Sequence, residues 1–190
     1  DDKEKAKKIC EEVIGRYPDK AIGHAMLGKV YLNMEDFEEA ERQLKHAIDL
    51  QPAWQFPSNM LVELYVKQGR ENQAVESINK LLEANKNVPW AYLSLAKLYE
   101  KSGEYQNAQA VYRKMLENFP ESWIAANNLA FLLIEVSVDK YKYEALQLAE
   151  KANKLRPQEG AILDTLSWIF YKRGELAQAA VNIEQALTYV

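Results

Sequence analysis

Few side chains in this sequence could carry out covalent or metal chemistry. His24 and His46 are 22 positions apart, which matches none of the short spacings used by neighbouring zinc ligands. The single cysteine, Cys10, excludes an internal disulfide and any cysteine-based metal cluster. Adjacent carboxylates such as Glu11 and Glu12 would point to different sides of a helix, and no glycine-rich phosphate loop occurs. We therefore predict that the protein is not an enzyme and uses no cofactor and no metal.

Composition narrows the possible partners. The 190 residues are 48% apolar and can bury a substantial core. A net charge of −4, with acids and bases interspersed, argues against a nucleic-acid binder, which would carry a basic excess. No apolar run approaches the roughly 20 residues of a membrane span. The sequence begins at Asp1 without Met, so we expect a trimmed form or a piece of a longer array. The compartment stays open: cytoplasm, or periplasm if a signal segment preceded residue 1.

One short motif recurs and reveals the organisation of the chain. KQGRENQA at 67–74, KSGEYQNA at 101–108 and KRGELAQA at 172–179 each end in alanine. A frame of 34 residues, with one three-residue insertion after the second copy, aligns six such alanines. They are Ala6, Ala40, Ala74, Ala108, Ala145 and Ala179. Aromatic residues precede most of them by nine positions, at Tyr31, Tyr65, Tyr99 and Phe170.

Each part of the frame has a physical reason. Leucine, a small residue and an aromatic at i, i+1 and i+4 form one apolar stripe of a helix. Gly69, Gly103 and Gly174 follow that helix and suit a left-handed cap. The alanines allow a second helix to approach the first closely, and a proline ends that second helix in most copies. Each unit is therefore predicted to be a helix, a tight turn and an antiparallel helix.

These residues at this period resemble the tetratricopeptide repeat, and the resemblance covers essentially the whole chain. It implies an all-α fold, a right-handed α-α superhelix formed as one domain over residues 1–190. We assign a half repeat at 2–18 and full repeats at 21–54, 55–88, 89–122, 123–159 and 160–190. The repeat at 123–159 departs from the pattern at Leu133, and its insertion predicts a longer loop or an extra helical turn near 137–140. NNLAFLL at 127–133 is similar to the ends of bacterial repeat arrays.

The frame also predicts where the reactive residues lie. Cys10 falls on the packing side of a helix and is expected to be buried and inert. His24 occupies a packing position, and His46 is expected on a solvated face. The charged second helices read as solvated faces with i,i+4 ion pairs.

The resemblance implies that first helices line a concave groove. The residues that face the groove are the first-helix positions outside the apolar packing stripe. They are unusually apolar for a surface, which indicates an interaction site. Asparagine amides there could pair with a peptide backbone without reading its sequence. The alternative is that the aromatic side chains pack between repeats. The predicted groove residues are Phe56, Asn59, Met60, Trp90, Lys97, Asn127, Asn128, Phe131, Asp164 and Trp168.

We predict a protein-interaction scaffold that holds a peptide or helix of a protein partner. A clamp for acidic chaperone tails is not expected, because Leu93, Ala161 and Thr165 stand where basic or amide residues are needed. One rival is self-assembly through the terminal helices, a homo-oligomer formed by Ile9, Cys10, Val13 and Ile14 against Ile183, Leu187 and Val190. A second rival, suggested by the repeat arm of O-linked N-acetylglucosamine transferase, is a substrate-presenting arm of a larger enzyme.

Overall fold

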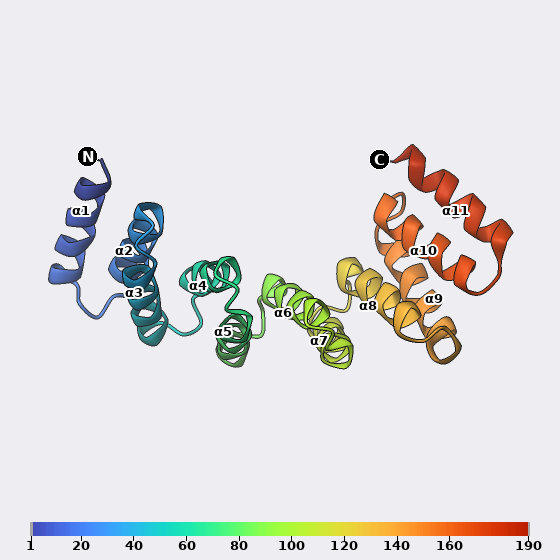
Figure 1. Cartoon of the computed structure of the whole chain (residues 1–190), viewed down its shortest axis with the longest axis horizontal. Coiled ribbons are helices and arrows are strands. Elements are labelled where there is room, and N and C mark those ends of the chain that lie inside the picture. The colour runs from blue at the N-terminus through green and yellow to red at the C-terminus, as the bar shows by residue number, and fades with distance from the viewer. Residues whose placement is uncertain (1, 190) are drawn as a thin grey trace. The chain divides into compact units, whose positions relative to one another are not determined.

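The computed structural model describes residues 2–189, which form eleven helices and contain no strand (Figure 1). The predicted all-α fold is confirmed. The helices are α1 Asp2–Arg16, α2 Ala21–Met34, α3 Phe37–Leu50, α4 Gln55–Lys67, α5 Glu71–Ala84, α6 Pro89–Lys101, α7 Tyr105–Asn118, α8 Trp123–Val136, α9 Val138–Leu155, α10 Gly160–Lys172 and α11 Leu176–Thr188.

The helices pack as successive pairs in the predicted repeat frame. α2 packs on α3, α4 on α5, α8 on α9 and α10 on α11, while α1 packs on α2 as a half repeat would. Contacts divide the chain into two compact units, residues 1–91 and residues 92–190, and each is considered by itself. One continuous domain over all repeats stays a prediction.

Small residues fix the distance between the two helices of each pair. A Cβ added to Gly28 on α2 would lie 2.8 Å from Leu44 Cγ on α3, closer than carbon atoms approach. On α10, the Ser167 hydroxyl donates a 2.8 Å hydrogen bond to the Ala179 carbonyl of α11. The aligned alanines of the full repeats are buried as predicted, at Ala40, Ala74, Ala108, Ala145 and Ala179.

The tight turns show the predicted left-handed backbone. Gly69, Gly103 and Gly174 have φ values of 68°, 77° and 79°. Glu35 occupies the same register between α2 and α3 with φ 62°. A side chain in this conformation costs about 1–2 kcal/mol relative to the right-handed region. The first hairpin therefore has a strained turn where three of the later hairpins have glycine.

The inserted residues near 137–140 lengthen a helix. α9 has 18 residues, whereas α3, α5 and α7 have 14 each. A single residue, Ser137, separates α9 from α8 and caps both helices. Of the two outcomes predicted for the insertion, the extra helical turn is the one that forms.

The burial expected for Cys10 is confirmed, and the face of α1 that the self-assembly alternative needs is exposed only in part. Cys10 is buried in a cluster with Leu27, Tyr31 and Ala40. Ile14 packs against the same cluster, so α2 and α3 already cover this side of α1. Burial raises the pKa of the Cys10 thiol, which leaves less of the reactive thiolate. Ile9 is exposed as predicted, and Val190 lies outside the described residues.

A largely buried carboxylate connects two hairpins of the first unit. Glu41 on α3 accepts hydrogen bonds from Arg70 (2.6 Å), Lys45 (2.7 Å) and the Tyr65 hydroxyl (3.0 Å). The Arg70 guanidinium also lies 4.5 Å from the Tyr65 ring centroid. Burial alone would raise the pKa of Glu41, but these three donors outweigh it and lower the pKa to about 2. The sequence had indicated a solvated face here.

Replacing Glu35 by glycine is expected to stabilise the first unit by about 0.5–1 kcal/mol. Relief of the left-handed strain exceeds the entropy that glycine adds to the unfolded chain. Urea unfolding measures the difference. Gly69→Ala is the matched control and should destabilise by about 1 kcal/mol. A lower unfolding midpoint for Glu35→Gly would contradict this account of the turn.

Acid should weaken the first unit through Glu41. Its pKa is about 2 in the folded state and about 4.5 when unperturbed. The stabilisation is therefore complete above pH 4.5 and is lost as the pH falls towards 2. Glu41→Gln should cost about 2 kcal/mol at pH 7 and flatten the acid dependence of unfolding. Glu76→Gln, which breaks the exposed Glu76–Lys80 pair, is the control and should leave unfolding nearly unchanged. Equal losses in both variants would refute the role of burial.

Candidate protein-interaction surfaces

Phe56 serves mainly as a wedge between hairpins in the first unit. Its ring stacks on Trp54 at 5.5 Å and packs against the buried cluster of Ala21, Ala25 and Ala47. The Lys29 ammonium lies 5.9 Å from the ring centroid. Phe56 is half-buried: part of its ring packs between the hairpins, as the alternative prediction has it, and the rest of the ring remains accessible.

Trp90 and Asn59 present polar groups beside this wedge. The Trp90 indole N–H donates a 3.0 Å hydrogen bond to Gln55 Oε1, which ties the start of α6 to the start of α4. Asn59 Nδ2 donates to Glu63 Oε1 at 3.2 Å along α4. An amide that donates through Nδ2 can still accept a backbone N–H through Oδ1. Both side chains are half-buried, as an accessible anchor requires.

Two predicted groove residues are buried instead. Met60 is 9% exposed on α4 and Asn127 is 8% exposed on α8. Met60 directly follows Asn59, and Asn127 directly precedes Asn128. A small rotation of each helix about its axis turns Met60 and Asn127 inward. Asn127 Oδ1 is enclosed and accepts no hydrogen bond from residues 2–189. Neither side chain can line an open surface.

Trp168 is the centre of a polar and aromatic cluster in the second unit. Its indole N–H donates a 2.7 Å hydrogen bond to Glu135 Oε1 on α8. The Lys172 ammonium lies 3.3 Å from the same oxygen and 4.7 Å from the Trp168 ring centroid. The Tyr171 ring stacks on Trp168 at 5.4 Å. The indole donor lowers the pKa of Glu135, and Lys172 reinforces this against a smaller opposing effect of burial.

The Trp168 cluster borders a hollow of about 360 Å³ between α10 and α11. We call the cluster and the hollow the Trp168 surface. Tyr171, 55% exposed, was not singled out from the sequence, although it lies one turn after Trp168. The hollow is lined by Asp164, Ser167, Trp168, Tyr171, Leu176, Ala179, Ala180 and Ile183.

The remaining predicted residues of the second unit lie on first helices. Phe131 on α8 is 45% exposed, and Asp164 on α10 is exposed at the hollow. Lys97 on α6 is exposed. Asn128 is half-buried, and its Nδ2 donates to the Tyr112 hydroxyl at 3.4 Å. The structure brings Asp164 and Trp168 to one hollow.

The paired helices, glycine turns and buried alanines define a helical-hairpin repeat protein. Models of the tetratricopeptide repeat match residues 23–53, 58–88 and 89–132. Together these segments cover more than half of the chain, which therefore belongs to the tetratricopeptide repeat family.

Relatives share the repeat over long stretches. A repeat-containing protein of Pseudomonas aeruginosa is 28% identical over 159 residues, 83% of this chain and 27% of its own. One from Methanocaldococcus jannaschii is 29% identical over 132 residues, 66% of this chain and 23% of its own. The chain thus spans about a quarter of the length of these curated relatives.

Solved structures show the same fold at lower identity. YrrB, a tetratricopeptide repeat protein described as having an unusual peptide-binding site, superposes with a TM-score of 0.73 at 14% identity, covering 97% of this chain and 93% of YrrB. MamA from Desulfovibrio magneticus gives 0.70 at 20% identity, covering 90% and 95%. Within residues 2–189, every helix falls short of the length and apolar character needed to cross a membrane.

The Trp168 indole N–H should report the titration of Glu135. As the carboxylate protonates, it becomes a weaker acceptor, so the indole signal should shift with a midpoint below the ordinary glutamate pKa. Proton–nitrogen correlation spectra across the acid range measure this shift. Glu135→Gln should abolish the titration of this signal and leave the Trp123 indole unaffected. A Trp168 signal that titrates equally in the variant would contradict the hydrogen bond.

Proposed function

We propose that the chain is a protein-interaction scaffold whose first-helix faces hold an extended or helical segment of a protein partner. The observation that carries the proposal is the Trp168 surface. It combines a hollow, two stacked aromatic rings and a hydrogen-bonded carboxylate–ammonium pair. Aromatic anchors beside a polar rim are typical of interaction hot spots.

The contacts of Trp168 favour binding over packing alone. Its ring is held from one side by Glu135 and Lys172 and from another by Tyr171. A pre-positioned ring spends little ordering entropy when a partner arrives. Phe131, on the neighbouring first helix, adds an exposed apolar side chain. In the first unit, Trp90 is held in a similar way by Gln55.

Similar proteins support the same proposal. YrrB is described as having a peptide-binding site. A human mitochondrial import receptor subunit is 26% identical over 113 residues, 58% of this chain and 18% of its own. The first is described as binding a peptide, and the second is named as a receptor. We extend that role to this chain, with the partner as a protein or peptide.

Self-assembly is the weaker proposal. α11 keeps its predicted exposed residues, with Ile183 at 38% exposure where the aligned Leu44, Ile78 and Tyr112 are at most 1% exposed. The other half of the contact, on α1, is largely covered by α2 and α3. A head-to-tail dimer would therefore have one apolar side and one largely charged side. An enzyme-presenting arm likewise stays a prediction, because it depends on sequence beyond these residues.

Trp90→Ala and Trp168→Ala together should abolish capture of the partner while helical content stays intact. Capture is measured by pull-down from the source organism, and helical content by circular dichroism. Tyr105→Ala is the matched control, since it removes an exposed aromatic ring from a second helix. Each single variant shows which unit carries the binding.

Light scattering on the same samples separates a partner from another copy of the chain. Capture that survives the double variant would refute the proposal. Capture lost equally in Tyr105→Ala would show that the effect is not specific to first helices.

A further inference from the structure

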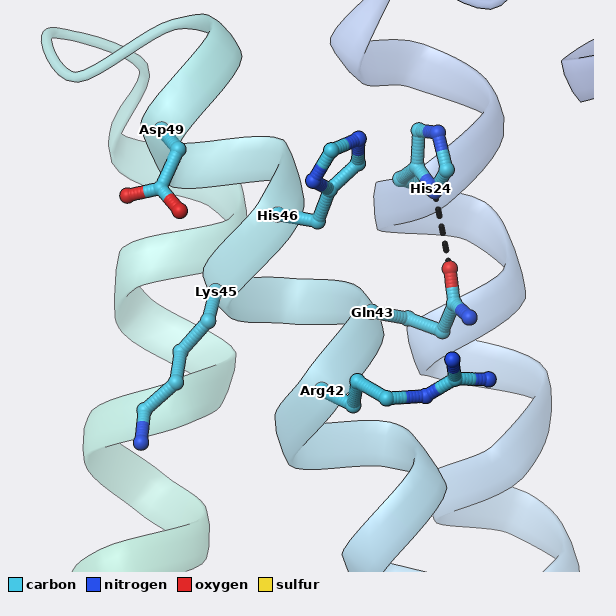
Figure 2. A pocket seen from close by; sticks show the side chains of 6 residues that line it. All are labelled: His24, Arg42, Gln43, Lys45, His46 and Asp49. Carbon is cyan, nitrogen blue, oxygen red and sulfur yellow. Dashed lines mark hydrogen bonds between the residues drawn. The ribbon is translucent and has the colours of Figure 1, made fainter.

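The two histidines of the chain meet across the first hairpin (Figure 2). His24 on α2 and His46 on α3 have ring centroids 4.2 Å apart and ring planes inclined at 74°. Their 22-position separation in the sequence is the path along one helix and back along its antiparallel partner. A spacing argument misses the pair because the turn brings the two positions together.

Packing of the repeat does not require either histidine. The residues aligned with His24 in the later repeats are Ser58, Tyr92, Ala126 and Leu163. Those aligned with His46 are Lys80, Lys114, Lys151 and Gln185. Imidazoles therefore replace unrelated residue types at two positions that face one another, and they do so together in one hairpin.

A glutamine orients one of the rings. His24 Nδ1 lies 2.8 Å from Gln43 Oε1. A carbonyl oxygen accepts, so Nδ1 carries a proton, and the neutral form of the ring has its lone pair on Nε2. Metal-binding histidines commonly have this arrangement, in which the second ring nitrogen donates to an oxygen and fixes the tautomer.

The rings border an accessible hollow of about 350 Å³. His24 is half-buried and His46 is exposed, so an ion in solvent can reach both. The hollow is lined by His24, Arg42, Gln43, Lys45, His46 and Asp49.

Neighbouring cations do not exclude a metal ion. Arg42 pairs with Glu39 at 2.5 Å, and Lys45 pairs with Glu41 at 2.7 Å. In Figure 2, Lys45 is directed away from the two imidazoles. Asp49, one turn after His46, also points away from His24 and does not complete a protein cage. Residues 2–189 contain no group of three histidine, cysteine, aspartate or glutamate side chains that could hold a metal.

We propose that His24 and His46 form a two-imidazole site for a divalent transition-metal ion, with water at the remaining positions. Imidazole nitrogen suits Zn²⁺, Ni²⁺ and Cu²⁺, whereas Mg²⁺ and Ca²⁺ prefer oxygen. Two protein ligands leave exchangeable positions, in contrast to the closed four-ligand structural zinc sites. The site stands independently of the proposed partner binding.

Zinc titration of the untagged chain tests the proposal. Calorimetry should show one Zn²⁺ bound per chain, and Mg²⁺ should give no signal. The chain has two histidines, so its imidazole signals in proton–nitrogen spectra are directly assignable. Both imidazole signals should move with the same midpoint.

His24→Ser and His46→Lys introduce residues that aligned hairpins carry, and each should weaken zinc binding at least tenfold. Gln43→Leu should weaken it about tenfold by releasing the His24 ring.

Several outcomes would overturn the site. They are movement of one imidazole signal alone, unchanged affinity in His46→Lys, or loss of binding in Cys10→Ser, which would place the ion at the thiol. Circular dichroism confirms that each variant is folded. Because Trp90 and Trp168 lie outside the site, partner capture should persist in His46→Lys, so failure of one proposal is distinguishable from failure of the other.

Discussion

Close approach of two helices in each hairpin is the constraint on which the structure depends. It requires a residue without bulk at the contact, and the chain supplies buried alanine at the same register of every full repeat. At Gly28 the contact with Leu44 is so close that even a methyl group would collide. Interiors are packed densely enough that such a collision moves the helices. Spacing within hairpins is thus set by small side chains, and the larger apolar residues are left to fill the space between hairpins.

Aromatic residues of first helices either pack between hairpins or remain accessible at the surface. Phe56 is partly enclosed by alanines of the preceding hairpin and by Trp54. Trp168 is held instead by polar groups and one stacked ring, beside an open hollow. The neighbours of each aromatic residue therefore decide its role. Phe56, surrounded by alanines, packs between hairpins, whereas Trp168, beside a carboxylate and an ammonium group, stays accessible to a partner. This difference is why the Trp168 surface, more than Phe56, carries the proposed function.

The sequence predicts features that repeat and misses those that occur once. Helix pairs and buried alanines follow from aligned positions, because every hairpin requires them. The glycine turns follow from the motif that three of the hairpins share. Met60 and Asn127 were placed wrongly because periodicity locates a face to within about one position, and small rotations decide burial. Glu35 gave no signal, since a left-handed turn with a non-glycine residue breaks the usual rule. The Glu41 network and the histidine pair depend on contacts between helices, which a single repeat frame does not contain.

A repeat scaffold separates positions that must be kept from positions that are free. Packing fixes the alanines and the apolar stripe, so substitution elsewhere costs little and can add chemistry. The first hairpin illustrates this. It holds a strained turn at Glu35, a largely buried carboxylate at Glu41 and two facing imidazoles, each at a register where other hairpins carry different residue types. Local exceptions to the repeat are therefore informative about function where they have no role in stabilising the fold, as at the two histidines.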